Sequence, residues 1–153
     1  MKISQTSDYE LIAILNKPVH DLHYSLYPKH FKEYDYNSAR EEFRKLINKD
    51  HFIFLLVKDC QQAVGYAWLE IREYPENAFK KAYRSLYVHQ LSINSTHRKK
   101  GYGTKLMNYI YSVAKEKETD RIELDYWFNN NIADEFYEKL GFVKYREIVW
   151  QSL

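Results

Sequence analysis

The first third of the chain carries apolar residues at helical spacing, interrupted by a polar aromatic stretch. A Ser-x-x-Glu capping pattern at 7–10 precedes the first helical run, and Pro18 is expected to interrupt that helix. A second capping pattern at 38–41 predicts the start of a second helix. The His- and Tyr-rich stretch 19–36 between them is expected to form an irregular loop, and residues 1–6 a short first strand.

The spacing of apolar residues along the chain changes at His51. Residues 51–57 and 63–71 are dense apolar runs separated by a polar turn, which predicts a β-hairpin. The remaining elements are expected as a strand at 84–93, a helix at 102–117, a strand at 121–127, a helix at 131–139 and a final strand at 143–151. Strands that alternate with helices after a hairpin predict a mixed sheet covered by helices, α/β or α+β, within a single domain of residues 1–153.

Composition narrows the class of protein. Of the 153 residues, 45% are hydrophobic and 29% are charged, which is typical of a globular domain. A net charge of +2 does not by itself favour binding to nucleic acid. The single cysteine, Cys60, forms no internal disulfide, and the N-terminus lacks a signal-peptide core, so we expect a cytoplasmic protein. No run reaches the ~18 to 20 apolar residues that span a membrane, so we expect no membrane insertion.

The sequence Arg-Lys-Lys-Gly-Tyr-Gly-Thr at 98–104 lies between a predicted strand and a predicted helix. Its two glycines allow successive N–H groups to point into one concavity, and the helix adds the positive end of its dipole. Cations at a helix N-terminus oppose that dipole unless an anion lies there. The turn therefore predicts a phosphate or pyrophosphate site, although its spacing fits neither a Walker loop nor a dinucleotide fingerprint.

A second motif follows at a fixed distance. Residues 130–142 read Asn-x-x-Ala-x-x-Phe-Tyr-x-x-x-Gly-Phe, and with Arg-x-x-Gly-x-Gly at 98–103 they resemble the two signatures of the GNAT superfamily of acetyl-CoA-dependent N-acetyltransferases. The resemblance covers residues 86–142 in the family's order and spacing. The N-terminal half is similar only in its order of elements.

The resemblance implies a GNAT-type fold, with a mixed, mostly antiparallel central sheet flanked by helices. The strand before the glycine turn and the strand 121–127 would run parallel and splay apart, with pantetheine of acetyl-CoA in the gap. The implied cofactor-binding residues are Leu91, Ser92, Ile93, Arg98, Lys99, Lys100, Gly101, Tyr102, Gly103, Thr104 and Asn130. Main-chain groups of Leu91 and Ile93 would pair with pantetheine as an added strand. Asn130 is equally well suited to cap the following helix.

The resemblance also implies catalytic residues. Tyr137 falls on the family's usual general acid, and a phenol with a pKa near ~10 suits protonation of a departing thiolate. The alternative is a tyrosine that only packs in the core. The base that takes the proton of the amine is left open between His89 and Glu70, each of which also suits an ordinary sheet residue. Strand alternation predicts His89 on the face of Leu91 and Ile93, with Gln90 opposite.

The expected reaction is direct acetyl transfer from acetyl-CoA to a primary amine. The six histidines lack accompanying ligands at metal-binding spacing, so we expect no metal. The acceptor site would involve 20–37, 74–83 and the C-terminal residues, and the protein would be a monomer or homodimer. Two alternatives remain. One is a nucleic-acid-binding module that uses the basic turn, and the other is a non-catalytic relative that binds coenzyme A.

Overall fold

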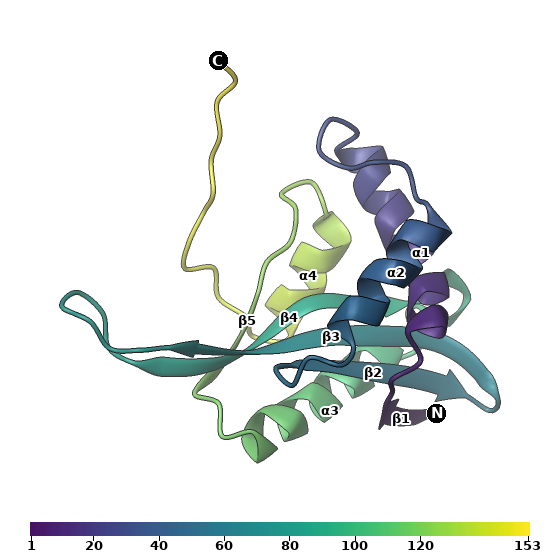
Figure 1. Ribbon diagram of the computed structural model, residues 1–153, viewed down its shortest axis with the longest axis horizontal. Coiled ribbons are helices and arrows are strands. Elements are labelled where there is room, and N and C mark those ends of the chain that lie inside the picture. Colours follow the sequence, from purple (N-terminus) through teal and green to yellow (C-terminus); the bar gives the residue numbers. More distant parts are fainter.

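A five-stranded sheet forms the centre of the computed structural model, which describes residues 1–153 (Figure 1). Its strands are β1 (Lys2–Gln5), β2 (Phe52–Asp59), β3 (Gln62–Tyr74), β4 (Tyr83–Ile93) and β5 (Arg121–Leu124). The strands follow one another in chain order across the sheet. The first four pair antiparallel, whereas β5 runs parallel to β4. The expected mixed, mostly antiparallel sheet is therefore confirmed.

Two apolar clusters lie on the two faces of this sheet. The helices are α1 (Tyr9–Leu26), α2 (Tyr36–Leu46), α3 (Tyr102–Glu116) and α4 (Asn131–Lys139). Helices α1 and α2 pack on the face that carries Phe54, Tyr66 and Trp68. Helices α3 and α4 pack on the other face, with Leu69 and Val88 of the sheet. Figure 1 shows α1 and α2 on one side of the sheet and α3 on the other.

Helix α1 continues through Pro18, where we expected it to be interrupted. A proline inside a helix costs about 3 kcal/mol because it removes one hydrogen bond and crowds the preceding turn. Contacts beyond the proline offset this cost: His20 and His23 pack against Phe31 with ring centroids 6.0 and 5.1 Å apart. His20 Nε2 also lies 2.7 Å from the carbonyl oxygen of Lys32. Tertiary packing therefore turns much of the expected loop into helix.

Aspartates, not the expected serines, cap the first two helices. Asp8 accepts a hydrogen bond from the N–H of Leu11, and Asp35 accepts one from the N–H of Ser38, at 2.9 and 2.7 Å. Both side chains satisfy N–H groups that have no partner within the helix. Helix α2 consequently begins at Tyr36, earlier than the capping pattern at 38–41 predicted.

The C-terminal part of the chain differs most from expectation. Strand β5 ends at Leu124 instead of continuing to 127, and residues 143–151 form no strand. The C-terminal segment instead extends away from the sheet (Figure 1). No helix of the protein combines the length and apolar character needed to cross a membrane.

Candidate functional site

The glycine turn leaves six successive backbone N–H groups without a partner. None of the N–H groups of residues 99–104 donates a hydrogen bond within the chain, and no side chain caps the start of α3. Lys99 and Gly101 adopt positive φ angles of 58° and 80°, which curl the backbone ahead of the helix. The exposed side chains of Lys99 and Lys100 form no ion pair. The turn thus has the curled backbone, free donors and positive charge that suit a phosphate group.

Neighbouring elements hold this turn in place. The Tyr102 hydroxyl donates to Asp59 at the end of β2 over 2.7 Å, and this hydrogen bond raises the pKa of Tyr102. Arg98 Nε donates to the carbonyl oxygen of Ile93 over 3.0 Å. A Cβ at Gly103 would lie 3.2 Å from the ring of Phe136, so glycine allows α4 to pack closely against the start of α3. Tyr102 and Arg98 therefore shape the turn through contacts within the chain.

The two parallel strands separate beside the turn. Pairing between β4 and β5 ends at Val88 and Leu124, while β4 continues to Ile93 along β3. The Asn94 N–H donates to Val64 on the β3 side. Because main-chain groups alternate between the two edges of a strand, those of Ile93 and Leu91 point toward the open side of β4. The carbonyl of Ile93 is engaged by Arg98, which leaves its N–H and both groups of Leu91 available.

A β-bulge places His89 and Gln90 on the same face of the sheet. Trp68 pairs with Gln90 and the next residue, Leu69, pairs with Val88, so His89 is the extra residue. His89 stacks on Trp68 with ring centroids 4.3 Å apart. Gln90 accepts hydrogen bonds from Asn16 and Tyr66 on the same α1/α2 face. The prediction that His89 shares the face of Leu91 and Ile93 is therefore wrong, because a bulge shifts the alternation by one residue.

His89 and Glu70, expected as alternative bases, are in direct contact. His89 Nε2 lies 2.7 Å from Glu70 Oε2, and Arg72 Nε donates to the same oxygen over 2.8 Å. Burial acts to raise the pKa of Glu70, but the hydrogen bonds from Arg72 and His89 outweigh it and hold that pKa below its ordinary value. Burial lowers the pKa of His89. Glu70 is therefore a carboxylate and His89 a neutral imidazole at pH 7.

The negative charge of Glu70 determines which ring nitrogen of the neutral His89 carries the proton. A carboxylate only accepts hydrogen bonds, so Nε2 of His89 must carry the proton that faces Glu70. The remaining nitrogen, Nδ1, then has a free lone pair. Nδ1 makes no hydrogen bond within the chain. The arrangement can therefore take up a proton at Nδ1 while Glu70 stabilises the imidazolium that forms.

Sequence reasoning did not single out three residues that continue this polar network. The Arg72 guanidinium lies 3.5 Å from the ring centroid of Tyr87 on β4. The Tyr87 hydroxyl donates to Asp125 over 2.5 Å, across the point where β4 and β5 separate. Burial and this hydrogen bond raise the pKa of Tyr87. Alternation along β3 and β4 could have indicated Arg72 and Tyr87, whereas Asp125 follows the end of β5 and had no such signal.

Tyr137 lies on α4 with a buried ring and an unpaired hydroxyl. The ring packs against Tyr126 and Phe142, with centroids 5.9 and 5.5 Å away. Burial raises the pKa of Tyr137. Its hydroxyl donates to no group of the chain, and it is absent from the buried atoms that lack a partner, so the oxygen is not sealed from solvent. The residue is thus both a core residue and a potential hydrogen-bond donor.

Asn130 caps α4, which was one of the two roles expected for it beside a contact with the cofactor. Its side-chain oxygen accepts a hydrogen bond from the N–H of Ala133 over 3.2 Å. The amide nitrogen of Asn130 makes no hydrogen bond within the chain. The cap therefore uses only the acceptor of this side chain and leaves its donor free.

Two of the segments expected around an acceptor meet near the site. Tyr27, in the loop after α1, packs on Trp127 with ring centroids 4.4 Å apart, and its hydroxyl accepts from the N–H of Asn129. Trp150 of the C-terminal segment contacts His30 of the same loop, with centroids 5.7 Å apart. The third segment, 74–83, lies elsewhere: it forms the tip of the β3–β4 hairpin at the opposite end of β4 from the glycine turn (Figure 1).

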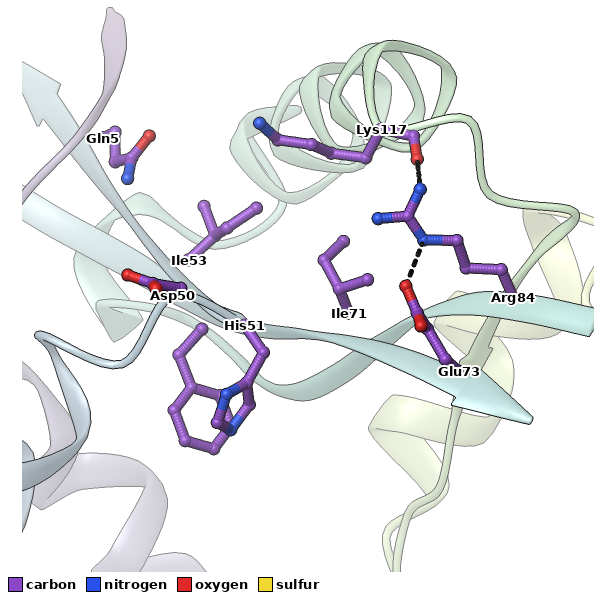
Figure 2. Close-up of a pocket in the computed structure, with 9 residues that line it drawn as sticks. Gln5, Asp50, His51, Ile53, Ile71, Glu73, Arg84 and Lys117 are labelled. Carbon is purple, nitrogen blue, oxygen red and sulfur yellow. Dashed lines mark hydrogen bonds and ion pairs between the residues drawn. The ribbon is translucent and has the colours of Figure 1, made fainter. Parts of the chain in front are cut away.

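A separate hollow of about 400 Å³ lies on the α3 side of the sheet near the C-terminal end of α3. Figure 2 shows Arg84 in this hollow, between Glu73 and the carbonyl oxygen of Lys117. None of the sequence-predicted site residues lines it. No three His, Cys, Asp or Glu side chains form a group that could hold a metal ion.

Comparison with known proteins agrees with this arrangement. Residues 16–142, well over half of the chain, match the family model described as the acetyltransferase (GNAT) family. The chain belongs to that family. The resemblance inferred from the motifs at 98–103 and 130–142 is therefore confirmed.

Two curated relatives match a shorter stretch of the chain. N-alpha-acetyltransferase 30 of Xenopus laevis is 35% identical over 65 residues, which cover 42% of this chain and 24% of that protein. The probable N-acetyltransferase san of Drosophila melanogaster is 42% identical over 60 residues, covering 39% of this chain and 33% of that protein. The matched stretch spans only a quarter to a third of these relatives.

Solved structures resemble the fold over the whole chain. The tetramutant of the BH1408 protein from Bacillus halodurans has a TM-score of 0.93 at 23% identity and covers 100% of both chains. The aminoglycoside N-acetyltransferase AAC(6′)-Iy in complex with CoA has a TM-score of 0.72 at 16% identity, covering 99% of this chain and 93% of that one. At these identities the likeness shows that the fold is shared.

The contact between His89 and Glu70 predicts the titration of His89. Because burial lowers the pKa of His89, an NMR titration of its ring should give a midpoint below 6.5. In Glu70→Gln the midpoint should move lower still, since the hydrogen bond and charge of Glu70 act to raise it. Glu73→Gln, at an exposed carboxylate of the same strand, should leave it unchanged. A midpoint that rises in Glu70→Gln would contradict this geometry.

Proposed function

We propose that the protein is an acetyl-CoA-dependent N-acetyltransferase that acts on a primary amine by direct attack. The observation that carries this proposal is the set of six unpartnered N–H groups at 99–104 beside the point where β4 and β5 separate. Family membership supports the reaction class, and the CoA complex of AAC(6′)-Iy supports the cofactor.

The chain offers contacts to the pyrophosphate and to the pantetheine arm of coenzyme A. The N–H groups of 99–104 would hold the pyrophosphate, with Lys99 and Lys100 supplying positive charge. The free main-chain groups of Leu91 and Ile93 would pair with the pantetheine amides in the gap beside β4. Asn130 would donate a hydrogen bond from its amide nitrogen to coenzyme A. Bound acetyl-CoA would supply the acetyl group and a thiolate leaving group.

Proton removal from the amine is assigned to His89. An alkylammonium group must lose a proton before its nitrogen can attack, and Nδ1 of His89 is a free acceptor. Glu70 holds the imidazole through Nε2 and stabilises the imidazolium. Arg72 keeps Glu70 ionised by donating to its carboxylate. His89 therefore acts as the base, directly or through a water, and Glu70 as its positioning partner.

Tyr137 would stabilise the charge that develops on sulfur. Burial raises the pKa of Tyr137, so its hydroxyl is still protonated at the pH where a thiol with a pKa near ~8.5 begins to ionise. The hydroxyl would therefore donate a hydrogen bond to the sulfur first, and complete proton transfer would be uphill. Packing against Tyr126 and Phe142 fixes the direction of this donor.

The acceptor amine would enter on the α1/α2 face of the sheet. His89 lies there, and the aromatic side chains of Tyr27, Trp127 and Trp150 gather where the loop after α1 meets the loop after β5. Aromatic faces attract cations, so these side chains suit an ammonium-bearing substrate. A peptide N-terminus, a lysine side chain and an aminocyclitol share this chemistry.

The basic turn predicts a charge-dependent affinity for coenzyme A. Replacing Lys99 and Lys100 together by glutamate should weaken binding by about 10- to 100-fold, because two attractive charges at the pyrophosphate become repulsive. The matched control reverses Lys115 and Lys117, exposed at the far end of α3. Isothermal titration calorimetry measures the affinity of both double variants for coenzyme A. Equal affinities of the two double variants would place the phosphates elsewhere.

The proposed activity predicts release of free coenzyme A. A thiol-release assay with acetyl-CoA and a panel of amines should give turnover with at least one peptide N-terminal amine, lysine side chain, polyamine or aminocyclitol. Turnover should require both substrates. Tight binding of coenzyme A without turnover on any amine would point to a non-catalytic relative. Binding of single-stranded nucleic acid without affinity for coenzyme A would point to the nucleic-acid-binding alternative.

Removing the Tyr137 hydroxyl separates packing from catalysis. Tyr137→Phe should lower kcat by about 10²- to 10³-fold with little change in KM, since the lost donor acts on charge formed only in the transition state. Tyr126→Phe is the matched control, because Tyr126 stacks on Tyr137 but directs its hydroxyl to Asp134. A kcat of Tyr137→Phe within a factor of two of the unaltered protein would leave Tyr137 as a packing residue only.

A further inference from the structure

Asp125 is an exposed carboxylate that forms no ion pair within the chain. It follows the last residue of β5, at the point where β4 and β5 separate. Its Oδ2 accepts a hydrogen bond from the Tyr87 hydroxyl over 2.5 Å, and its Oδ1 makes no hydrogen bond. Each oxygen of a carboxylate accepts more than one hydrogen bond, so Asp125 keeps acceptor capacity that the chain does not use.

This carboxylate lies on the same side of the sheet as His89. The ring of Tyr87 lies between them, because its centroid is 5.0 Å from that of His89 and its hydroxyl donates to Asp125. The negative charge of Asp125 also acts to raise the pKa of His89, so the two side chains are close enough for their charges to interact. An acceptor whose reacting nitrogen contacts Nδ1 of His89 therefore has Asp125 within reach of the rest of its chain.

The other charges in this network compensate one another. Arg72 Nε donates to Glu70 over 2.8 Å, so the guanidinium and the carboxylate form an ion pair. His89 is neutral at pH 7 because burial lowers its pKa. Glu70, Arg72 and His89 together therefore carry no net charge, and Asp125 adds one negative charge to the group. That charge suits one permanent cation of a ligand.

An aromatic surface follows Asp125 along the chain. Trp127, two residues later, contacts Tyr27 and Phe31 of the loop after α1, with ring centroids 4.4 and 5.1 Å apart. Aromatic faces attract alkylammonium groups and also exclude water from them. A cation held by a carboxylate beside aromatic rings is screened less than one on an open surface.

We propose that the acceptor carries a second ammonium group, which Asp125 holds while the first nitrogen loses its proton to Nδ1 of His89. The inference rests on the proposed acetyl transfer. The C–N bond forms at the first nitrogen as the C–S bond of acetyl-CoA breaks, and the electron pair of that bond leaves with sulfur. The second nitrogen keeps its proton throughout and neutralises Asp125.

The length of the Tyr87 side chain sets the spacing of the two nitrogens. Tyr87 contacts His89 with its ring and Asp125 with its hydroxyl, so the two groups lie one tyrosine side chain apart. An extended chain of four to six carbons places its terminal nitrogens roughly 6 to 9 Å apart at ordinary bond lengths. Short aliphatic diamines therefore match this spacing.

The first test compares 1,5-diaminopentane with 1-aminopentane and 5-amino-1-pentanol in the coenzyme A release assay. The diamine should have a kcat/KM about 10- to 50-fold higher than either single amine, mainly through a lower KM, because Asp125 holds the second charge before and during the reaction. Asp125→Asn should reduce this ratio to about 2, the value expected from two equivalent nitrogens. Asp50→Asn, at an exposed aspartate in the hollow on the α3 side, should leave the ratio unchanged.

Tyr87→Phe separates the carboxylate from the hydrogen bond that orients it. This variant keeps both the aromatic ring and the charge of Asp125, so it should retain most of the preference for the diamine. A preference that is lost in Tyr87→Phe but kept in Asp125→Asn would assign the selection to Tyr87 and overturn the proposal.

Calorimetry on the protein saturated with coenzyme A tests the cation site without turnover. The diamine should bind more tightly than 1-aminopentane, and Asp125→Asn should remove the difference. Tighter binding of the diamine without acetylation of any amine would support the cation site and contradict the transfer reaction. Turnover with equal kcat/KM for the diamine and the single amines, apart from the factor of two, would support the transfer reaction and overturn the cation site.

Discussion

The end of pairing between β4 and β5 is the constraint on which the candidate site depends. Because the two strands part after Val88 and Leu124, the last five residues of β4 keep one edge without a neighbouring strand. The glycine turn then follows directly, so its free N–H groups open beside the same gap. Helix α4 packs against the start of α3 through Phe136, and Tyr137 is the next residue of that helix. Continued pairing of β5 would fill the space that the cofactor is proposed to occupy.

The bulge at His89 adds the second feature of the site. In a regular strand His89 and Gln90 would face opposite sides of the sheet, but the extra residue turns both toward α1 and α2. Gln90 then forms hydrogen bonds in a buried network with Asn16 and Tyr66, while His89 contacts Glu70. The bulge thus leaves Gln90 with a structural role and His89 available for chemistry.

Local patterns predicted the elements better than their ends or their surroundings. The helix after the glycine turn and the cap at Asn130 follow from short-range chemistry, and both form as expected. Pro18 was misjudged because the contacts of His20 and His23 with Phe31 come from a distant part of the chain. The bulge could not be predicted either, since it depends on the register of β3 against β4. The strand expected at 143–151 has the right residues but no partner within the chain.

The most direct test of the account is an amide NMR titration of the protein with coenzyme A. The largest shifts on addition of coenzyme A should occur at the N–H groups of 99–104, followed by those of Leu91 and Ile93. These groups have no other hydrogen-bond acceptor within the chain. Amides around Arg84 and His51, in the hollow of Figure 2, should stay unchanged. Shifts confined to that hollow, or no shifts at 99–104 at saturating coenzyme A, would contradict the proposed site.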